Sequence, residues 1–460
     1  MTQEMKVSVG DVRGLGTLAG EMQDPVAPAS GDIAVMRKVQ RRLVGFLFVL
    51  FVFSFLDRIN IGFAGLTMNR DLGLSATEFG FASTIFYVAY VCFGIPSNLM
   101  LSRVGARRWI AVIMIAWGIA STSTMFAWSA GSLYVLRVFV GITEAGFLPG
   151  ILLYLTFWFP SAYRARANAL FMIAMPVTSA LGAIASGYVL KLDGVHALHG
   201  WQWLFLIEGF PAVVLGVATW FYLDDTPAKA TWLNEDERAA HARLLQLDDA
   251  KRDAERATPS AMGSDTSVWG CLTSRPIVQL AVIYFLMVNT LGMISTWAPL
   301  ILKSFSHGSS DFMVAVLSAV PHVCTVIAMV FWGRRSDKHQ ERRIHVAIPM
   351  AMAALGWLAT AYGGSAAVKL AGLCAASAGA YAAMTIFWTL PDTVMPRRHR
   401  AVGIGFVNAA GIAGAALNAV IVGYLRDVTT SFTSGLVYAA VVMFLGAVLV
   451  LTFRGNGQRA

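Results

Sequence analysis

Residues 43–65 read LVGFLFVLFVFSFLDRINIGFAG, an apolar run that holds one charged pair, Asp57 and Arg58. An α-helix rises 1.5 Å per residue, so about 20 residues cross the roughly 30 Å of hydrocarbon in a bilayer. The run is too long for the core of a signal peptide and lacks a small-residue cleavage site. We therefore expect it to be retained as the first membrane-spanning helix.

Further apolar runs of similar length follow, separated by short charged clusters. The 460 residues are 57% hydrophobic and 13% charged, whereas a water-soluble domain carries roughly 25% charged residues. The short alternating segments of a β-barrel are not visible in the sequence. The sequence therefore predicts an all-α integral membrane protein with twelve transmembrane helices, at residues 43–65, 78–101, 109–129, 132–157, 167–190, 203–223, 276–302, 312–333, 344–363, 367–390, 401–424 and 433–453.

The basic residues gather in alternate loops. Most of the 35 Lys and Arg residues lie in the N-terminal tail, the loop at Arg103–Arg108, the long polar segment in the middle of the chain and the loop at Arg334–Arg343. Under the positive-inside rule these loops and both termini face the cytoplasm. Membrane topology thus accounts for the net charge of +9, and we expect no nucleic-acid partner.

The long polar segment at 224–275 divides the chain into two similar halves. The sequence NLMLSRVGARR (98–108) follows the second predicted helix, and GRRSDKHQERR (333–343) follows the eighth. This repeat predicts two six-helix bundles in the same orientation, with a cavity between them near the bilayer midplane. The expected organisation is a cytoplasmic tail at 1–42, an N-terminal bundle at 43–223, a partly helical cytoplasmic linker at 224–275, a C-terminal bundle at 276–454 and a tail at 455–460.

The two repeated loops are candidate conformational gates. A small residue lets neighbouring helices approach, and an acid with arginines can bridge their ends. The residues that we assign to this role are Arg103, Arg107, Asp337 and Arg342. Because the first loop has Ser102 where the second has Asp337, we expect a weaker charge latch in the N-terminal half.

The repeated loops and the doubled six-helix plan resemble the major facilitator superfamily over essentially the whole chain. Finer motifs resemble its anion:cation symporter family, and within it the bacterial tartrate, phthalate and hydroxyphenylacetate permeases. These motifs are LDRIN (56–60), IPSN (95–98), RVFVGITEAGFLPG (137–150), FWTLP (387–391) and Asn408. The resemblance implies a secondary active transporter of the bacterial inner membrane, a monomer, that imports a small carboxylate with a proton by alternating access.

Four ionisable residues lie near the middle of predicted spans. Asp57 and Arg58 are in the first span, and Arg137 and Glu144 are in the fourth, two helical turns apart and so on one face. Each unpaired charge at this depth costs at least about 2.5 kcal/mol, so each must face a partner or a water-filled cavity. Neighbouring residues diverge by about 100° around a helix, and one arrangement has Arg58 in the cavity and Asp57 towards Arg137.

We assign Arg58 to the substrate carboxylate, because a guanidinium stays charged and offers a planar two-pronged donor. Arg137 assists it or pairs with Asp57, while Asp57 and Glu144 are the candidate proton carriers. The simpler interpretation is that two acids and two arginines neutralise each other and hold two helices together.

The C-terminal half has no comparable buried charge, so we expect it to contribute shape, stacking and hydrogen bonds. The resemblance supports Trp388 and Asn408 as substrate-binding residues. Tyr87, Tyr90, Tyr284 and Asn289 could line the same cavity, although aromatic residues in membrane helices are often packing residues or interface anchors.

The alternative function is a drug or metabolite efflux antiporter of the same superfamily. Efflux members carry Gly-Pro followed by paired glycines in the fifth helix, where this chain reads AMPVTSALG (174–182). A sensor would add a signalling domain, and no catalytic constellation, metal cluster or nucleotide loop indicates an enzyme. We expect no metal or other cofactor, with the proton gradient as the energy source. Proton and sodium coupling both remain open, as do aromatic acids, hydroxy diacids and sugar acids as substrates.

Overall fold

The computed structural model describes residues 30–257, 267–306, 308–339, 341–391, 394–395 and 399–453, and the regular elements in these ranges are helices. Within them, twelve helices or joined helix pairs are long and apolar enough to cross a membrane. The prediction of an all-α membrane protein with twelve spans is therefore confirmed.

The N-terminal half builds six spans from seven α-helices, because α4 and α5 together form one span. Their bounds are α1 (Ser30–Asp71), α2 (Ala76–Val104), α3 (Ala106–Ser123, continued by a 3-10 turn to Phe126), α4 (Ala130–Glu144), α5 (Phe147–Trp158), α6 (Ser161–Leu190) and α7 (Gly200–Tyr222).

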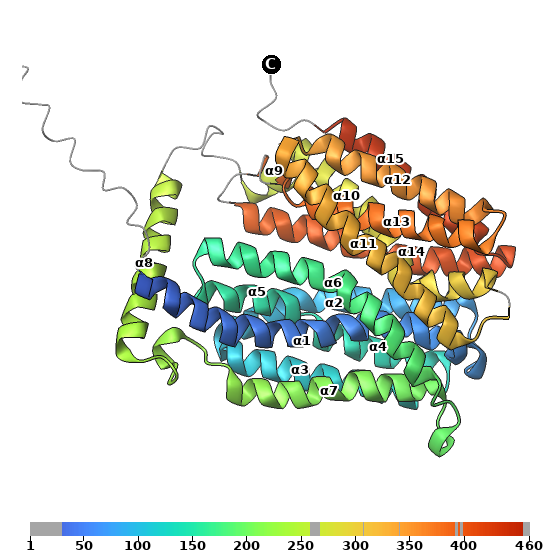
Figure 1. Cartoon of the computed structure of the whole chain (residues 1–460), viewed down its shortest axis with the longest axis horizontal. Coiled ribbons are helices and arrows are strands. Elements are labelled where there is room, and N and C mark those ends of the chain that lie inside the picture. The colour runs from blue at the N-terminus through green and yellow to red at the C-terminus, as the bar shows by residue number, and fades with distance from the viewer. Residues whose placement is uncertain are drawn as a thin grey trace, which may run out of the picture.

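The linker carries two helices, and the C-terminal half carries six. Their bounds are α8 (Glu235–Ala257), α9 (Val268–Leu272), α10 (Arg275–Phe305), α11 (Asp311–His339), α12 (Arg343–Tyr362), α13 (Ala366–Phe387), α14 (Arg400–Thr429) and α15 (Thr433–Leu451). In Figure 1, α8 lies across one end of the two bundles. We call this end of the molecule the linker end and the opposite end the far end.

The first helix begins at Ser30, well before the predicted start of the first span at residue 43. Residues 30–42 carry five charged side chains, and contacts with α8 support their helical form. Arg243 of α8 donates to Asp32, and Lys38 donates to Glu237 at 2.6 Å. This hydrogen bond, with a second from the backbone of Asn234, holds the pKa of Glu237 below its usual value. The described part of the N-terminal tail is thus a continuation of α1.

The fourth span is broken between Glu144 and Phe147. Proline has no N–H, and its ring clashes with the carbonyl four residues earlier in a helix. Pro149 therefore interrupts the regular helix after Glu144 but is accepted in the first turn of α5. A side chain at Gly146 would collide with Ser97 of α2, so the break also brings α2 close.

The two halves meet most closely towards the far end. Thr84 of α2 donates to the carbonyl of Ala416 in α14 at 2.7 Å. A Cβ at Gly80 would collide with the carbonyl oxygen of Ala419. Asp427, near the end of α14, accepts hydrogen bonds from the backbone N–H of Ala76 at 3.0 Å and of Thr77 at 2.7 Å, at the start of α2. In this conformation the far end is closed.

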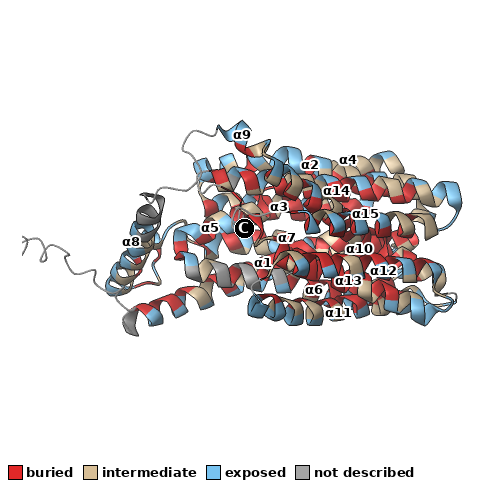
Figure 2. Cartoon of the chain, turned by 90° about the horizontal axis from the view of Figure 1, so that it is seen from above, coloured by how far each residue is buried: buried red, intermediate tan, exposed pale blue. Residues whose placement is uncertain are grey.

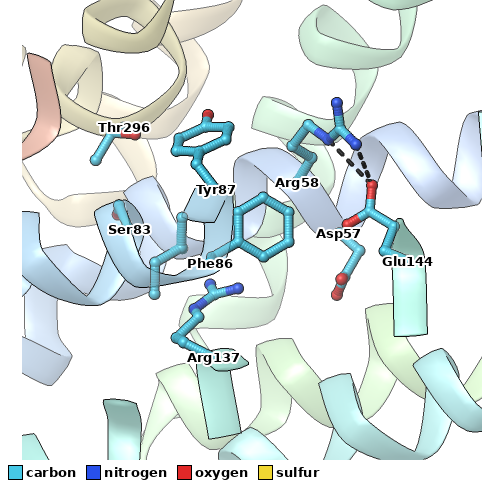
Figure 3. Close-up of a pocket in the computed structure, with 9 residues that line it drawn as sticks. Asp57, Arg58, Ser83, Phe86, Tyr87, Arg137, Glu144 and Thr296 are labelled. Atoms are coloured by element: carbon cyan, nitrogen blue, oxygen red, sulfur yellow. Dashed lines mark hydrogen bonds and ion pairs between the residues drawn. The ribbon is translucent and has the colours of Figure 1, made fainter. Parts of the chain in front are cut away.

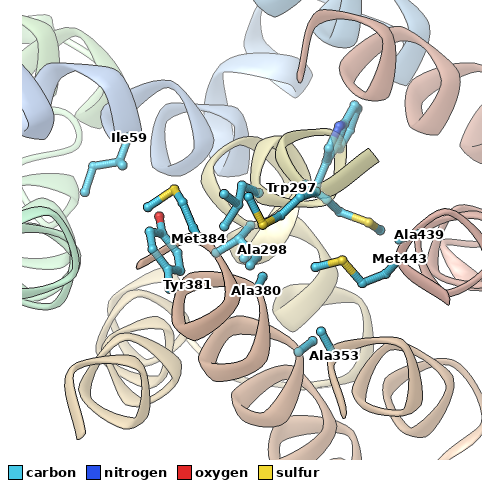
Figure 4. Close-up of a cluster of buried hydrophobic side chains, with 14 of the residues drawn as sticks. Ile59, Trp297, Ala298, Ala353, Ala380, Tyr381, Met384, Ala439 and Met443 are labelled. Atoms are coloured by element: carbon cyan, nitrogen blue, oxygen red, sulfur yellow. The ribbon is translucent and has the colours of Figure 1, made fainter. Parts of the chain in front are cut away.

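Buried residues form the interior of both bundles, whereas α8 is largely exposed (Figure 2). In the C-terminal half the core is built from large and small side chains that interlock, such as Trp297, Met443, Ala353 and Ala380 (Figure 4). The same cluster continues to Ile59 of α1, and α10 packs against this helix, which carries Asp57 and Arg58.

Replacing Gly80 by Leu is expected to prevent closure of the far end, because the new side chain needs space that the backbone of Ala419 occupies. Spin labels at two exposed far-end positions, Val195 and Val428, report the separation of the halves. We expect a longer distance between them in Gly80→Leu.

The matched control is Gly45→Leu, because a Cβ at Gly45 meets nothing within 4 Å. This variant should leave the distance between the labels unchanged. An unchanged distance in Gly80→Leu as well would show that the contact with Ala419 does not govern closure.

Candidate functional site

The four intramembrane charges lie together between α1 and α4. Asp57 is 2% exposed, Arg137 is 4% exposed and Glu144 is 1% exposed, whereas the Arg58 side chain keeps 26% of its surface accessible. The sequence-based expectation that these residues share one site agrees with this geometry. Arg58 is the most accessible of the four.

Arg58 forms an ion pair with Glu144, which joins α1 to α4 (Figure 3). Its Nε donates to Glu144 Oε1 at 3.1 Å, and its Nη2 donates to the same oxygen. The guanidinium also lies over the ring of Tyr90, 5.0 Å from the centroid. The second carboxylate oxygen of Glu144 has no hydrogen-bond partner among the described residues. Arg58 thus binds one carboxylate group of the protein, and the carboxylate of a ligand would offer it the same acceptor atoms.

Asp57 points away from Arg58, towards α3 (Figure 3). It accepts hydrogen bonds from Asn60 Nδ2 at 2.9 Å, from Trp117 Nε1 at 2.8 Å and from Ser121 Oγ. Trp117 and Ser121 are one helical turn apart, so α3 presents both donors to the same carboxylate. This differs from the expected direct pair of Asp57 with Arg137, because neutral donors on α3 already satisfy the carboxylate.

Arg137 is buried beside aromatic rings. Its guanidinium lies 5.9 Å from the ring centroid of Phe86 and 5.8 Å from that of Phe205. Among the described residues, its Nε and Nη2 have no hydrogen-bond partner. The nearest negative charges, Asp57 and Glu144, act on it through space. Arg137 therefore has donors available for a further acceptor.

The cavity between these side chains has a volume of about 10 Å³. A cavity of this size is at the lower limit for one water molecule. Its lining includes all four charged residues and, from the C-terminal half, Thr296 of α10. Tyr87, Ser83, Phe86 and Ile61 complete it. A substrate can enter only if the surrounding helices move apart.

The other predicted binding residues of the C-terminal half do not line this cavity. The ring centroid of Tyr284 lies 4.9 Å from that of Phe387 and 4.8 Å from that of Trp388. The two predicted binding residues Tyr284 and Trp388 therefore pack against each other. Asn408 is exposed on α14.

Asn289 is fully buried within the C-terminal half, and its amide is already used. It donates to the carbonyl of Gly414 at 3.1 Å and to Tyr438 Oη at 2.8 Å, and it accepts from Asn418 at 3.2 Å. The expectation that Asn289 lines the cavity therefore does not match this conformation, because the amide ties α10 to α14 and α15.

Two residues of the C-terminal half that the sequence did not single out face the charged cluster. Thr296 lines the cavity, and Tyr381 of α13 is close enough to Arg58 and Tyr87 to interact electrostatically with both. Thr296 carried no distinguishing signal. Tyr381 stands alone among small residues in SAGAYAAM (377–384), which is a usable signal for a polar group on an inner helix.

Glu208 of α7 is a further buried acid that sequence reasoning missed. It is 3% exposed, and it accepts a hydrogen bond from Ser186 of α6 at 2.7 Å. It lies inside the predicted span at 203–223. Because acids are rare in apolar runs, its position in the sequence was a usable signal. It does not line the central cavity.

The predicted gating residues lie at the linker end. Arg342 pairs with Asp337 at 2.8 Å. In the N-terminal copy the backbone N–H of Arg107 donates to Asp225 at 3.0 Å, and its side chain lies 4.0 Å from the same carboxylate. Arg103 is exposed. The acid that the first loop lacks at Ser102 is thus supplied from the linker by Asp225.

Replacing Asp57 by Ala is expected to destabilise the protein strongly, by about 3–5 kcal/mol, because it removes the negative charge beside a buried arginine and leaves the Trp117 and Ser121 donors without their acceptor. The midpoint of thermal unfolding of the purified protein in detergent measures the loss.

The control for this prediction combines Asp57→Ala with Arg137→Met. Removing the arginine as well relieves the unbalanced charge, so the double variant should regain part of the lost stability. A double variant that is less stable than Asp57→Ala alone would contradict the proposed balance between the two charges.

Comparisons with known proteins agree with this architecture. The model of the Major Facilitator Superfamily matches residues 46–417. A protein of Agrobacterium vitis named "Putative tartrate transporter" is 40% identical over 438 residues, which cover 95% of each chain. A quinolone resistance transporter of Acinetobacter baumannii is 30% identical over 91% of this chain and 94% of its own.

A solved structure also shares the fold. The inward open conformation of the xylose transporter XylE from E. coli superposes with a TM-score of 0.70 at 14% identity, over 91% of this chain and 97% of that chain. At this identity the likeness concerns the fold alone.

Proposed function

Because this chain belongs to the Major Facilitator Superfamily of membrane transporters, we propose that it takes up a small carboxylate together with a proton. The proposed setting is a bacterial inner membrane with the linker end in the cytoplasm, and the proposed mechanism is alternating access by a monomer.

The observation that supports this proposal most directly is the ion pair of Arg58 with Glu144. The guanidinium holds a carboxylate of the protein in a cavity of about 10 Å³. A substrate carboxylate presents the same acceptor atoms, so it competes with Glu144 for Arg58. The available donors of Arg137 and the Thr296 hydroxyl can take the remaining oxygens of the substrate.

Competition for Arg58 links the substrate to a proton. When a substrate anion takes Arg58, the Glu144 carboxylate loses its partner in a site shielded from water. An unpaired negative charge there is costly, and protonation removes it. Each bound carboxylate thus brings one proton to Glu144. When the substrate leaves, Arg58 is again available to the ionised carboxylate, and the proton is released.

Asp57 has a different part in this scheme. Its three hydrogen bonds keep the carboxylate on α3, where it balances the charge of Arg137. We therefore assign proton transfer to Glu144 and the charge balance of Arg137 to Asp57. This narrows the pair of proton carriers expected from the sequence.

The closed far end fits one stage of the cycle. With the linker end in the cytoplasm, this conformation blocks the route to the outside. Closure depends on direct packing of α2 against α14, and the return step must separate this contact.

Efflux is the second candidate, because one relative is named as a quinolone resistance transporter. The site favours anions over cationic drugs. Asp57 and Glu144 together balance Arg58 and Arg137, and protonation of Glu144 leaves a net positive charge. Both acids that line the cavity are already occupied, because Glu144 pairs with Arg58 and Asp57 accepts hydrogen bonds from α3. A cation would therefore find no available carboxylate among the lining residues.

Binding of carboxylates should depend on Arg58. We expect a hydroxy diacid, an aromatic acid or a sugar acid to raise the unfolding midpoint of the purified protein, and Arg58→Ala to abolish the rise, because a ligand stabilises only the state that binds it. Arg108→Ala, an exposed arginine outside the site, is the matched control. Stabilisation by hydrophobic cations alone, unchanged in Arg58→Ala, would favour efflux.

Proton coupling should depend on Glu144. If one proton is taken up with each anion, the affinity of the wild-type protein should rise up to about tenfold for each unit by which the pH falls. Glu144→Gln is expected to bind the anion with little dependence on pH and to lose accumulation against a gradient in proteoliposomes.

Glu208→Gln provides the matched control, because it changes an equally buried acid that lies outside the cavity. It should retain the pH dependence of binding. Accumulation that persists in Glu144→Gln would assign coupling to another group.

A further inference from the structure

A second and much larger cavity lies at the linker end, away from the charged cluster. Its volume is about 520 Å³, within the roughly 300–1,000 Å³ typical of sites for small ligands. Three separate segments build it: the first turns of α1, the end of α7 and the segment before α8. The lining residues are Ala34, Arg37, Lys38, Arg41, Arg42, Tyr222 and Trp232.

The wall formed by α1 is strongly basic. Lys38 is paired with Glu237 at 2.6 Å. Arg37 and Arg41 are exposed, one helical turn apart, and no acidic side chain among the described residues pairs with either. The other nearby acids are engaged: Asp32 pairs with Arg243, and Asp224 accepts from Trp232. The cavity therefore has an excess of positive charge.

The floor of the cavity is aromatic. The Arg42 guanidinium lies 4.7 Å from the ring centroid of Tyr222 and 4.8 Å from that of Trp232. Trp232 is itself stacked on Trp158 at 5.8 Å. The Nε of Arg42 is buried and has no hydrogen-bond partner among the described residues. Stacking thus fixes the orientation of an arginine that keeps an unused donor.

The position of the cavity along the spans indicates which anions it meets. Arg42 directly precedes the apolar run that begins at Leu43, and Tyr222 is the last residue of the span formed by α7. Tyrosine and tryptophan are common at the level of the lipid headgroups. Basic pockets at this level bind anionic headgroups, whose phosphate oxygens accept from several arginines at once.

We propose that this cavity binds the phosphate group of an anionic phospholipid. Arg37 and Arg41 attract the phosphate from the wall, and the Arg42 guanidinium, held on the two aromatic rings, adds its positive charge to the lining. The headgroup then bridges α1 to the end of α7 and to the linker. This inference is independent of the transported substrate and of the roles of Arg58 and Glu144.

The test uses the full chain reconstituted in phosphatidylcholine nanodiscs. Phosphatidylglycerol is titrated in, and binding is measured by native mass spectrometry and by the shift of the unfolding midpoint. We expect Arg37→Ala/Arg41→Ala to bind phosphatidylglycerol at least about tenfold more weakly than the wild-type protein. Both side chains are exposed, so the variant should fold.

Two further variants separate a built site from general attraction to a basic surface. Arg334→Ala/Arg335→Ala removes an exposed basic pair at the same end of the molecule, outside the cavity, and should bind the lipid as the wild-type protein does. Tyr222→Leu keeps every charge but removes a ring below Arg42, and it should weaken binding. The proposal would be overturned if the two double-arginine variants lost phosphatidylglycerol affinity equally, or if Tyr222→Leu left that affinity unchanged.

Glycerol 3-phosphate distinguishes the source of the phosphate. It carries the same group without the acyl chains, so we expect little stabilisation at concentrations where phosphatidylglycerol saturates the site. Equal stabilisation by the soluble ester would assign the cavity to a phosphate ester in solution and overturn the lipid assignment.

Discussion

The ion pair between Arg58 and Glu144 joins α1 to α4 at a depth where an unpaired charge is most costly. Removing one member of such a pair leaves the other buried and unbalanced, at a cost of about 3–5 kcal/mol. The pair is therefore stable only as long as nothing else satisfies the arginine. Under the proposed function, a substrate anion takes over the arginine, and the structural contact thereby becomes responsive to a ligand.

The two halves of the molecule contribute different kinds of residue around the buried ion pair. The N-terminal half holds all four charges of the central cavity, and α3 contributes neutral donors that keep Asp57 in place. The C-terminal half presents close-packed small and aromatic residues, with Thr296 and Tyr381 nearest the charges. The ion pair of the cavity lies within the N-terminal half, so the two halves can separate there without breaking it.

The sequence was sufficient for the architecture, because apolar runs of membrane length and basic loops are visible without any structure. It placed the twelve spans and found Asp57, Arg58, Arg137 and Glu144, since charges in apolar runs are rare. It did not indicate the start of α1, because five charged side chains interrupt residues 30–42 and contacts with α8 hold their helix.

The pairing within the site could not be predicted from spacing. Which acid meets Arg58 depends on the rotation of α1 against α3 and α4, and the donors that turn Asp57 aside are neutral residues with no charge signal. Asn289 shows the opposite difficulty: a polar residue in a span can be a binding group or an internal brace, and only its partners tell them apart.

The contact of Asp225 with the loop between α2 and α3 bears on where the N-terminal unit ends. Six spans finish at Tyr222, yet the duplicated loop finds its acid three residues later, and the Tyr154 hydroxyl binds the carbonyl of Asp224 at 2.8 Å. Gly105, at φ 98°, lets the loop approach this carboxylate. The first copy thus keeps the paired arginines of the repeat, but its acid comes from outside the loop. A chimera that exchanges N-terminal bundles between relatives must carry residues 224 and 225 with the bundle to keep this loop intact.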